Sequence, residues 1–196
     1  MNLSDLMGSP IGQSIVKNVA GQFGLNEKQA STAVNTAIPA ILSGMSKNVQ
    51  TPEGAESLNK ALETKHDGSL LDNLSGLLGG GNMDALMKDG GGILGHIFGN
   101  QVDDVQNGLA KKAGISSDKM GSIIKMLAPI VMAYLGKEKS SKNLSAGALG
   151  GLLEGVLGGG AKKKGGGLLD VVTGFLDKDK DGSALDDVIG MFTKKK

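Results

Sequence analysis

Several residue types are absent or scarce in this chain of 196 residues. There is no cysteine and no tryptophan, and only one tyrosine and four phenylalanines are present. Without cysteine, the chain has no disulfides, no thiolate chemistry and no cysteine-based zinc or iron–sulfur site. With so few aromatic residues, a core must be built from Leu, Ile, Val, Met and Ala, which suits helix packing better than a sheet. The composition therefore favours an all-α protein.

Arginine is also absent, so the 21 basic residues are all lysines, and with 20 acidic residues the formal net charge is +1. Because the arginine fork is the usual means of bidentate recognition of phosphate and guanine, we expect no specific nucleic-acid recognition. The N-terminus lacks the basic start and apolar run of a secretory signal. The longest apolar stretch, residues 123–135, is interrupted by Lys125 and is too short to span a bilayer. We expect a cytoplasmic protein with no membrane span.

Catalytic motifs are missing as well. His66 and His96 are the only histidines, and neither lies at metal-ligand spacing with a partner. No nucleophile elbow, phosphate-binding loop or zinc-protease motif is present. A lone histidine more often ends a helix or packs against one, although a functional role for either stays open. We expect a protein that is not an enzyme.

The apolar residues recur at helical spacing along the whole chain, and capping signals mark where helices begin. Asn26 can cap a helix, with Gln29 at the capping-box position. Thr51 precedes a proline and a glutamate, which is a second start signal. Glycines should close three short helices between the two halves of the chain, over residues 69–78, 82–88 and 93–98. No stretch has the alternation of a strand.

An internal repeat organises these helices. Shifting the sequence by 90 positions places Gly24 on Gly114 and Pro39 on Pro129, with apolar residues matching on either side. The shared element is a helix, a glycine turn and a longer helix with an internal proline. We predict a helical bundle built from two pseudo-repeated helix-turn-helix units. The predicted units are residues 1–88 and residues 89–196.

Each predicted repeat leads into the same short pattern, Asp-Gly-Ser-x-x-Asp, at residues 67–72 and 181–186. The second repeat is longer because a Gly/Lys-rich insert, about residues 158–167, precedes the pattern. The chain after the insert is predicted to form an EF-hand-like helix-loop-helix over about residues 167–192.

The aspartate loop in that segment is the strongest candidate metal site. Three aspartates alternate ahead of Gly182, which places them at positions one, three and five of a calcium loop, with glycine at six. Val188 stands at position twelve instead of a bidentate glutamate, so a later aspartate would have to close the site. We expect calcium, with a dissociation constant of roughly 10⁻⁵ to 10⁻³ M. The candidate ligands are Asp177, Asp179, Asp181, Ser183, Asp186 and Asp187.

Two interpretations need no metal. The loop can be a solvated acidic turn whose charge is balanced by Lys178 and Lys180. In addition, the serine and the final acid of each Asp-Gly-Ser-x-x-Asp pattern are spaced as a capping box. We do not expect the first copy of the pattern to bind an ion, because Lys65 stands where an acid is needed.

Three segments together resemble the YidB-like family of uncharacterised bacterial proteins (DUF937). They are residues 66–72, residues 92–99 and residues 127–136. The resemblance covers roughly residues 9–192 and implies a bacterial source and an all-helical bundle. It implies no established activity and no agreed site residues. The terminal aspartate loop separately resembles the EF-hand signature.

The expected function is therefore binding or scaffolding without catalysis, with an unknown protein partner. One structural or regulatory calcium site would order the C-terminal helix pair. The alternative is a weak binder of nucleic acid or of an anionic surface that uses the lysine clusters at residues 162–164 and 194–196.

Overall fold

The computed structural model describes residues 3–76 and 83–158 of the chain. All regular structure in these two ranges is helical and neither contains a strand, which confirms the all-α prediction for this part of the protein. The elements in chain order are α1 (Leu3–Gly8), α2 (Pro10–Phe23), α3 (Glu27–Asn48), α4 (Pro52–Thr64), α5 (Ser69–Asp72), α6 (Leu74–Gly76), α7 (Met83–Phe98), η2 (Gly99–Gln101), α8 (Val102–Ala113), α9 (Ser117–Ser141), η3 (Ala146–Ala148) and α10 (Leu149–Leu157).

Side-chain caps fix where the helices begin, as the sequence indicates. The Asn26 side chain accepts a hydrogen bond from the Gln29 amide at 2.8 Å, and the Gln29 side chain accepts one from the Asn26 amide at 3.3 Å. This is the predicted capping box. Thr51 caps α4 by accepting from the Gly54 amide at 3.1 Å, so the second start signal is also confirmed.

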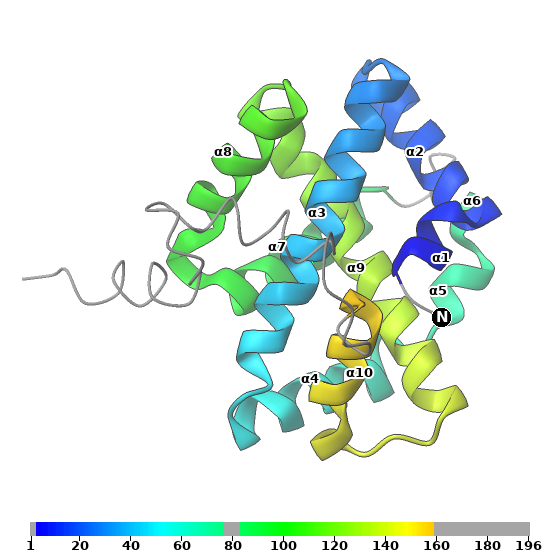
Figure 1. The fold of residues 1–196 in the computed structure, drawn as a ribbon, viewed down its shortest axis with the longest axis vertical. Helices are drawn as coiled ribbons and strands as arrows, with labels where there is room; N and C mark the ends of the chain where they lie inside the picture. Colours follow the sequence, from blue (N-terminus) through cyan, green and yellow to red (C-terminus); the bar gives the residue numbers. More distant parts are fainter. Residues whose placement is uncertain (1–2, 77–82, 159–196) are drawn as a thin grey trace, which may run out of the picture.

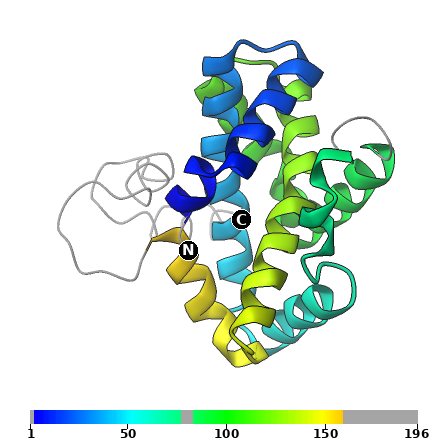
Figure 2. The ribbon, with the colours of Figure 1, turned by 90° about the vertical axis from the view of Figure 1, so that its right-hand side faces the viewer.

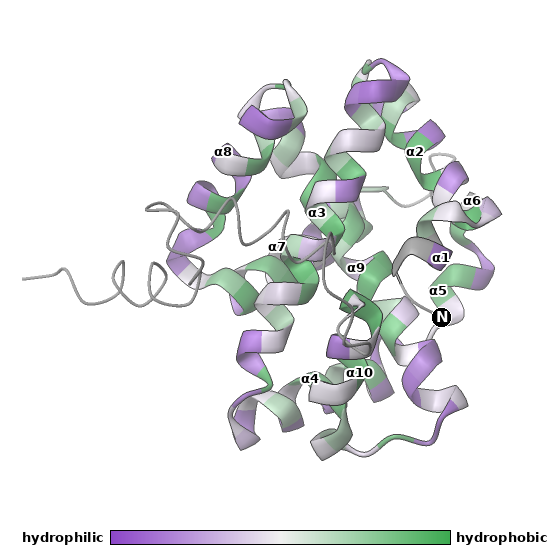
Figure 3. Ribbon diagram, viewed as in Figure 1, coloured by the Kyte–Doolittle hydropathy of each residue, from purple (hydrophilic) through white to green (hydrophobic). Residues whose placement is uncertain are grey.

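The core forms around α3 and α9, which lie side by side through the middle of the molecule (Figures 1 and 2). The turns of the α2–α3 and α8–α9 hairpins lie together at the top of both views. Helix α9 also packs against α4, α5, α7 and α8, so its middle is buried on all sides. In Figure 3, hydrophobic residues gather where these helices meet, and hydrophilic residues gather at the outer ends. A helix that is apolar all round belongs in such an interior.

Helix α9 has the length and composition of a membrane span, because it extends beyond the apolar stretch seen in the sequence. Its 25 residues are, by length and composition, enough to cross a membrane. However, 83% of the most apolar window is buried inside the fold, against the neighbouring helices. That burial accounts for the apolar composition through core packing, and the prediction of no membrane span stays a prediction.

Helix α7 corrects one prediction from the sequence. The glycines at positions 90–92 were expected to separate two short helices, but α7 continues through them from Met83 to Phe98. A methyl group at Gly90 would collide with the carbonyl group of Lys125 in α9. The missing side chain therefore lets two helix backbones touch, and this packing outweighs the low helix propensity of glycine. The predicted division at residue 88 falls inside α7.

The turn between α4 and α5 is pressed onto the end of α9. A side chain at Gly136 would collide with the carbonyl oxygen of His66, so the turn depends on glycine there. Gly68 has φ +106°, a left-handed conformation that L side chains rarely adopt, and a Cβ there would lie 2.9 Å from Lys137 Cβ. These two close approaches fix the position of His66.

Two ion pairs hold the same region together. Lys139 Nζ lies 2.8 Å from Glu63 Oε1 and joins the end of α9 to α4. The hydrogen bond from Lys139 is the main reason that the pKa of Glu63 lies below its ordinary value. Lys137 Nζ lies 3.3 Å from Asp72 Oδ1, a contact between two exposed side chains. We regard the exposed Lys137–Asp72 pair as an aid to orientation, since exposed ion pairs contribute little stability, whereas Lys139 is buried beside α4.

Candidate functional site

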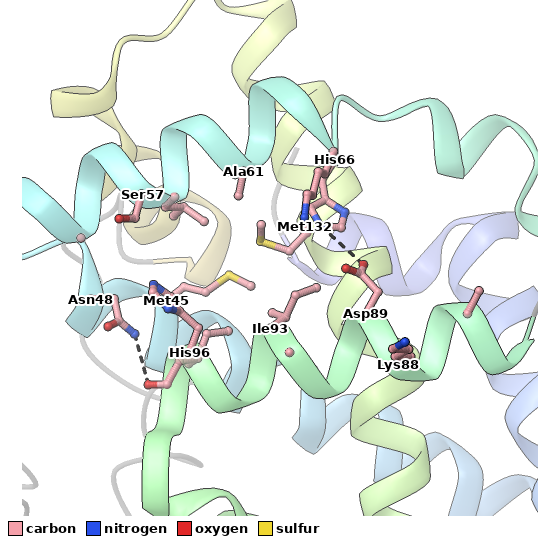
Figure 4. Close-up of a pocket in the computed structure, with 16 residues that line it drawn as sticks. Met45, Asn48, Ser57, Ala61, His66, Lys88, Asp89, Ile93, His96 and Met132 are labelled. Carbon is pink, nitrogen blue, oxygen red and sulfur yellow. Dashed lines mark hydrogen bonds and ion pairs between the residues drawn. The ribbon is translucent and has the colours of Figure 1, made fainter.

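An open groove of about 640 Å³ lies between α4 and α7. These two helices make no extensive contact with each other, and residues of α3 and α9 form the floor between them. Figure 4 shows α4 above the groove and α7 below it. The residues that line it are Met45, Asn48, Gly54, Ser57, Leu58, Ala61, Lys65, His66, Ala85, Lys88, Asp89, Gly92, Ile93, His96, Ile97 and Met132.

The floor and most of the walls are apolar. The buried side chains of Met45 and Met132 come from α3 and α9, and Figure 4 shows them between the two walls. The wall residues Leu58, Ala61 and Ile93 are half-buried, so the groove leaves part of their apolar surface uncovered. Flexible methionines suit a floor that must adapt to what lies on it.

His66 and Asp89 face each other at one end of the groove (Figure 4). His66 Nε2 lies 3.6 Å from Asp89 Oδ2, which is an electrostatic contact too long to be a hydrogen bond. The histidine side chain is 5% exposed and that of Asp89 is 41% exposed. His66 Nδ1 is buried and has no hydrogen-bond partner among the described residues.

Burial lowers the pKa of His66 below its ordinary value of 6.5, and the charge of Lys65 lowers it further. The carboxylates of Asp89 and Asp67 oppose this shift, but burial is the larger influence. Protonation would place a hydrogen on both ring nitrogens, and Nδ1–H would then be a buried donor with no acceptor in the described structure. His66 is therefore neutral at pH 7.

This neutral histidine predicts a pH dependence of stability. The unfolded chain takes up a proton near pH 6.5, whereas folded His66 takes it up at lower pH. Between these two pKa values the unfolded state binds more protons, so the free energy of unfolding should fall as pH falls through 6.5. Urea unfolding between pH 7.5 and pH 5.5 measures this slope. His66→Gln should flatten it, and His96→Gln, which removes the exposed histidine, should leave it unchanged.

Two lysines flank the same end of the groove. Lys65 follows α4 and Lys88 precedes Asp89 on α7, and both are exposed. Neither forms an ion pair within the part of the chain that the structure describes. At the opposite end, the Asn48 amide donates to the carbonyl of Ile97 at 3.1 Å and is thus engaged. The two ends of the groove therefore differ in charge.

The first Asp-Gly-Ser-x-x-Asp pattern begins a helix in a way that the sequence analysis misassigned. The predicted capping box between Ser69 and Asp72 is wrong, because no side chain caps α5 from its N-cap residue, Gly68. Instead the Ser69 amide donates to Asp67 Oδ1 at 3.0 Å, and this hydrogen bond lowers the pKa of Asp67. Asp72 turns toward Lys137 of α9.

The predicted calcium ligands Asp177, Asp179, Asp181, Ser183, Asp186 and Asp187 lie outside the described residues. The Gly/Lys-rich insert and the two lysine clusters lie there as well. Within residues 3–76 and 83–158, no three His, Cys, Asp or Glu side chains are grouped so that they could hold a metal ion.

Both histidines are visible in the sequence, but the groove that they share is not. His66 and His96 line one groove, and the partner of His66 is Asp89 on a helix that follows much later in the chain. A signal was present: Asp89, Ile93 and His96 are spaced i, i+4 and i+7, which places them on one face of a helix. Because a break was expected at the glycines, these three residues were not assigned to one helix.

The fold and the groove define this chain as a helical-bundle protein with an open, largely apolar cleft at its side. The chain belongs to the family described as "Bacterial protein of unknown function (DUF937)", whose model matches residues 5–138. Every residue that lines the groove falls within this match, and the aspartate loop falls beyond it. No curated protein and no solved structure matches the chain.

Proposed function

We propose that the protein is a non-catalytic binding module whose ligand lies in the groove between α4 and α7. The groove itself carries this proposal. Its volume lies within the range of about 300–1,000 Å³ that is typical of ligand sites, and its lining joins an apolar floor to a few polar groups. Because α4 and α7 are separated, the apolar surface over Met45 and Met132 is left open to a bound molecule.

Absence of catalysis is part of the proposal. The groove contains Ser57, two histidines and Asp89, but no hydrogen bond among the described residues joins Ser57 to His66 or to His96, so they do not form a catalytic constellation. Ser57 and His66 are nine positions apart along α4 and its end, which is roughly 13 Å at helical rise. That distance is far beyond the hydrogen-bond reach that a nucleophile and its base require. Figure 4 likewise draws Ser57 at the far side of the groove from His66 and Asp89.

Blocking the groove should abolish ligand binding. Gly92 lines the groove, and a Cβ there would meet no atom within 4 Å, so the backbone accepts a side chain and Gly92→Leu should fill part of the groove without disturbing the fold. The dye 1-anilinonaphthalene-8-sulfonate, which has apolar rings and one sulfonate group, serves as the probe. We expect it to fluoresce with the native protein and to lose most of this signal with Gly92→Leu.

The matched control is Gly95→Leu, on the same helix. Gly95 is exposed, a Cβ there would likewise meet no atom within 4 Å, and it does not line the groove. It should therefore keep the fluorescence of the unmodified protein. Equal signals from the two variants, or no signal from the native protein, would contradict the proposal.

We also propose that the aspartate loop binds one calcium ion and that this ion orders the C-terminal end of the chain. The proposal rests on the spacing of Asp177, Asp179 and Asp181 ahead of Gly182. A competing interpretation comes from the first copy of the pattern, where Asp67 begins a helix through a backbone hydrogen bond. Asp181 could do the same without an ion, so the two roles need a direct test.

Calcium titration distinguishes a calcium site from a helix start that needs no ion. We expect isothermal titration calorimetry to give one site per chain, and a tenfold excess of calcium over the dissociation constant to raise stability by roughly 1.4 kcal/mol. Asp177→Ala should abolish the heat, whereas Asp67→Ala should leave it unchanged because that residue binds a backbone amide. If millimolar calcium produces neither heat nor a rise in melting temperature, the loop is only a charged turn.

We further propose that the bundle arose from two pseudo-repeated helix-turn-helix units of a YidB-like chain. Supporting this, α2 and α8 both end at a glycine with positive φ, and these glycines, Gly24 and Gly114, are 90 positions apart. Helix α4 packs on α9 and α10 packs on α3, as a repeat requires. The packing is not fully symmetric, because α8 packs extensively on α3 and α2 has no contact of similar extent with α9.

The alternative function, weak binding to nucleic acid or to an anionic surface, would rest on the lysines at residues 162–164 and 194–196. Binding of that kind falls steeply with salt in proportion to the phosphates neutralised. The near-neutral charge and the absence of arginine favour the groove proposal over this one.

A further inference from the structure

We propose that the ligand of the groove is an amphiphile with one anionic head and a linear apolar tail, of the alkyl carboxylate class. The head would lie between Lys65 and Lys88, and the tail would lie along the methionine floor. This inference rests on the proposed binding function, to which it adds the chemistry of the ligand.

The charge of the groove is concentrated at one end. Lys65 and Lys88 come from opposite walls, and each is next in sequence to a member of the His66–Asp89 pair. Among the described residues that line the groove, Asp89 is the only carboxylate, and it faces His66. Two exposed ammonium groups with no ion-pair partner in the described chain thus outnumber one carboxylate. This end is suited to an anion.

The rest of the groove is suited to a tail. Met45 and Met132 form its floor, and Ile93 contributes to the wall beside them (Figure 4). At the far end, Asn48 donates its side-chain N–H groups to the Gly44 and Ile97 carbonyl groups, which leaves only its side-chain oxygen for a ligand, and Ser57 and His96 also line this end (Figure 4). A ligand that fits would be charged at one end and apolar along the methionine floor.

The length of the groove sets the size of the tail. The lining residues of this wall extend from Gly54 in α4 to Lys65 just after it, which is about 16 Å at helical rise. An extended alkyl chain advances about 1.2 Å per bond, so about twelve carbons fill that length. A helix from a partner protein would need polar and charged contacts along both rims. The single charged end favours the smaller ligand.

The test compares decanoate with decanol, two probes with the same tail and different heads, below the concentration at which decanoate forms micelles. The readout is the ε-methyl NMR signal of Met45 and Met132 in the full chain. Met120 and Met126 are buried outside the groove and serve as internal controls. Both probes should shift the two groove methyls, and decanoate should bind about three- to tenfold more tightly because exposed ion pairs have modest strength.

The double variant Lys65→Gln/Lys88→Gln should remove that preference and leave decanol binding unchanged. Lys60→Gln/Lys111→Gln, which changes two lysines outside the groove lining, should preserve it. Equal binding of both probes by the native protein, or a preference that survives in the groove double variant, would overturn the anionic-head inference while the groove proposal stands. Failure of both probes to shift the groove methyls would overturn both.

Discussion

Replacing Gly90 by alanine should destabilise the protein by about 3 kcal/mol, the upper end of the cost of overpacking a rigid core. The added methyl group would collide with the Lys125 carbonyl group of α9. Backbone atoms of a buried helix cannot move aside as the end of a flexible side chain can, so α7 and α9 would have to separate. Because α7 packs on α9 more extensively than any other element does, the separation would disturb the core and one wall of the groove.

The adjacent glycine provides the control. A methyl group at Gly91 would meet no atom within 4 Å, so Gly91→Ala should stabilise the protein by roughly 0.5–1 kcal/mol through helix propensity alone. Urea unfolding of both variants measures the difference. If Gly90→Ala is as stable as Gly91→Ala, the two helix backbones are not in contact at this point.

Replacing Gly136 by alanine is the second substitution with a large expected effect, a destabilisation of about 2–3 kcal/mol. The methyl group would collide with the His66 carbonyl oxygen and would approach Asp67 Cα to 3.2 Å. The turn after α4 would be pushed away from α9. We therefore expect His66 to be less buried, which reduces the main cause of its lowered pKa, and hence a smaller pH dependence of stability between pH 7.5 and pH 5.5 in addition to the loss of stability.

Gly121, on the same helix, tests whether the loss of stability depends on which atoms the added methyl group meets. The atoms nearest to a methyl group there are those of the Gln106 amide, the end of a flexible side chain, which can rotate away at the loss of its hydrogen bond to Ser117. We expect Gly121→Ala to remain within about 1 kcal/mol of the native protein, since helix propensity offsets the small rearrangement. A loss equal to that of Gly136→Ala would show that α9 tolerates no glycine replacement, and would remove the specific role of the His66 turn.

The local signals in the sequence predicted the helix starts well. The capping box of Asn26 and Gln29 and the start at Thr51 depend on residues within one turn of each other, and both form as expected. The apolar composition also predicted helix packing without a sheet in the described chain. Structural features that are set by residues close together in the sequence could therefore be predicted.

Structural features that depend on packing between distant segments of the chain could not be predicted from the sequence. The glycines at positions 90–92 indicated a break, because the contact of Gly90 with α9 cannot be seen from local propensity. For the same reason, the pairing of His66 with Asp89 was missed: it requires α4 and α7 to lie on either side of a common floor. The Ser69 capping box failed because Asp67, two residues earlier, supplies the hydrogen bond.

The central claim is that ligands bind in the groove over Met45 and Met132. Nuclear Overhauser effects between bound decanoate and the methionine ε-methyl groups test it most directly. The account predicts cross-peaks from the alkyl protons to the methyls of Met45 and Met132 and none to those of Met120 and Met126. Cross-peaks confined to methionines outside the groove would contradict it.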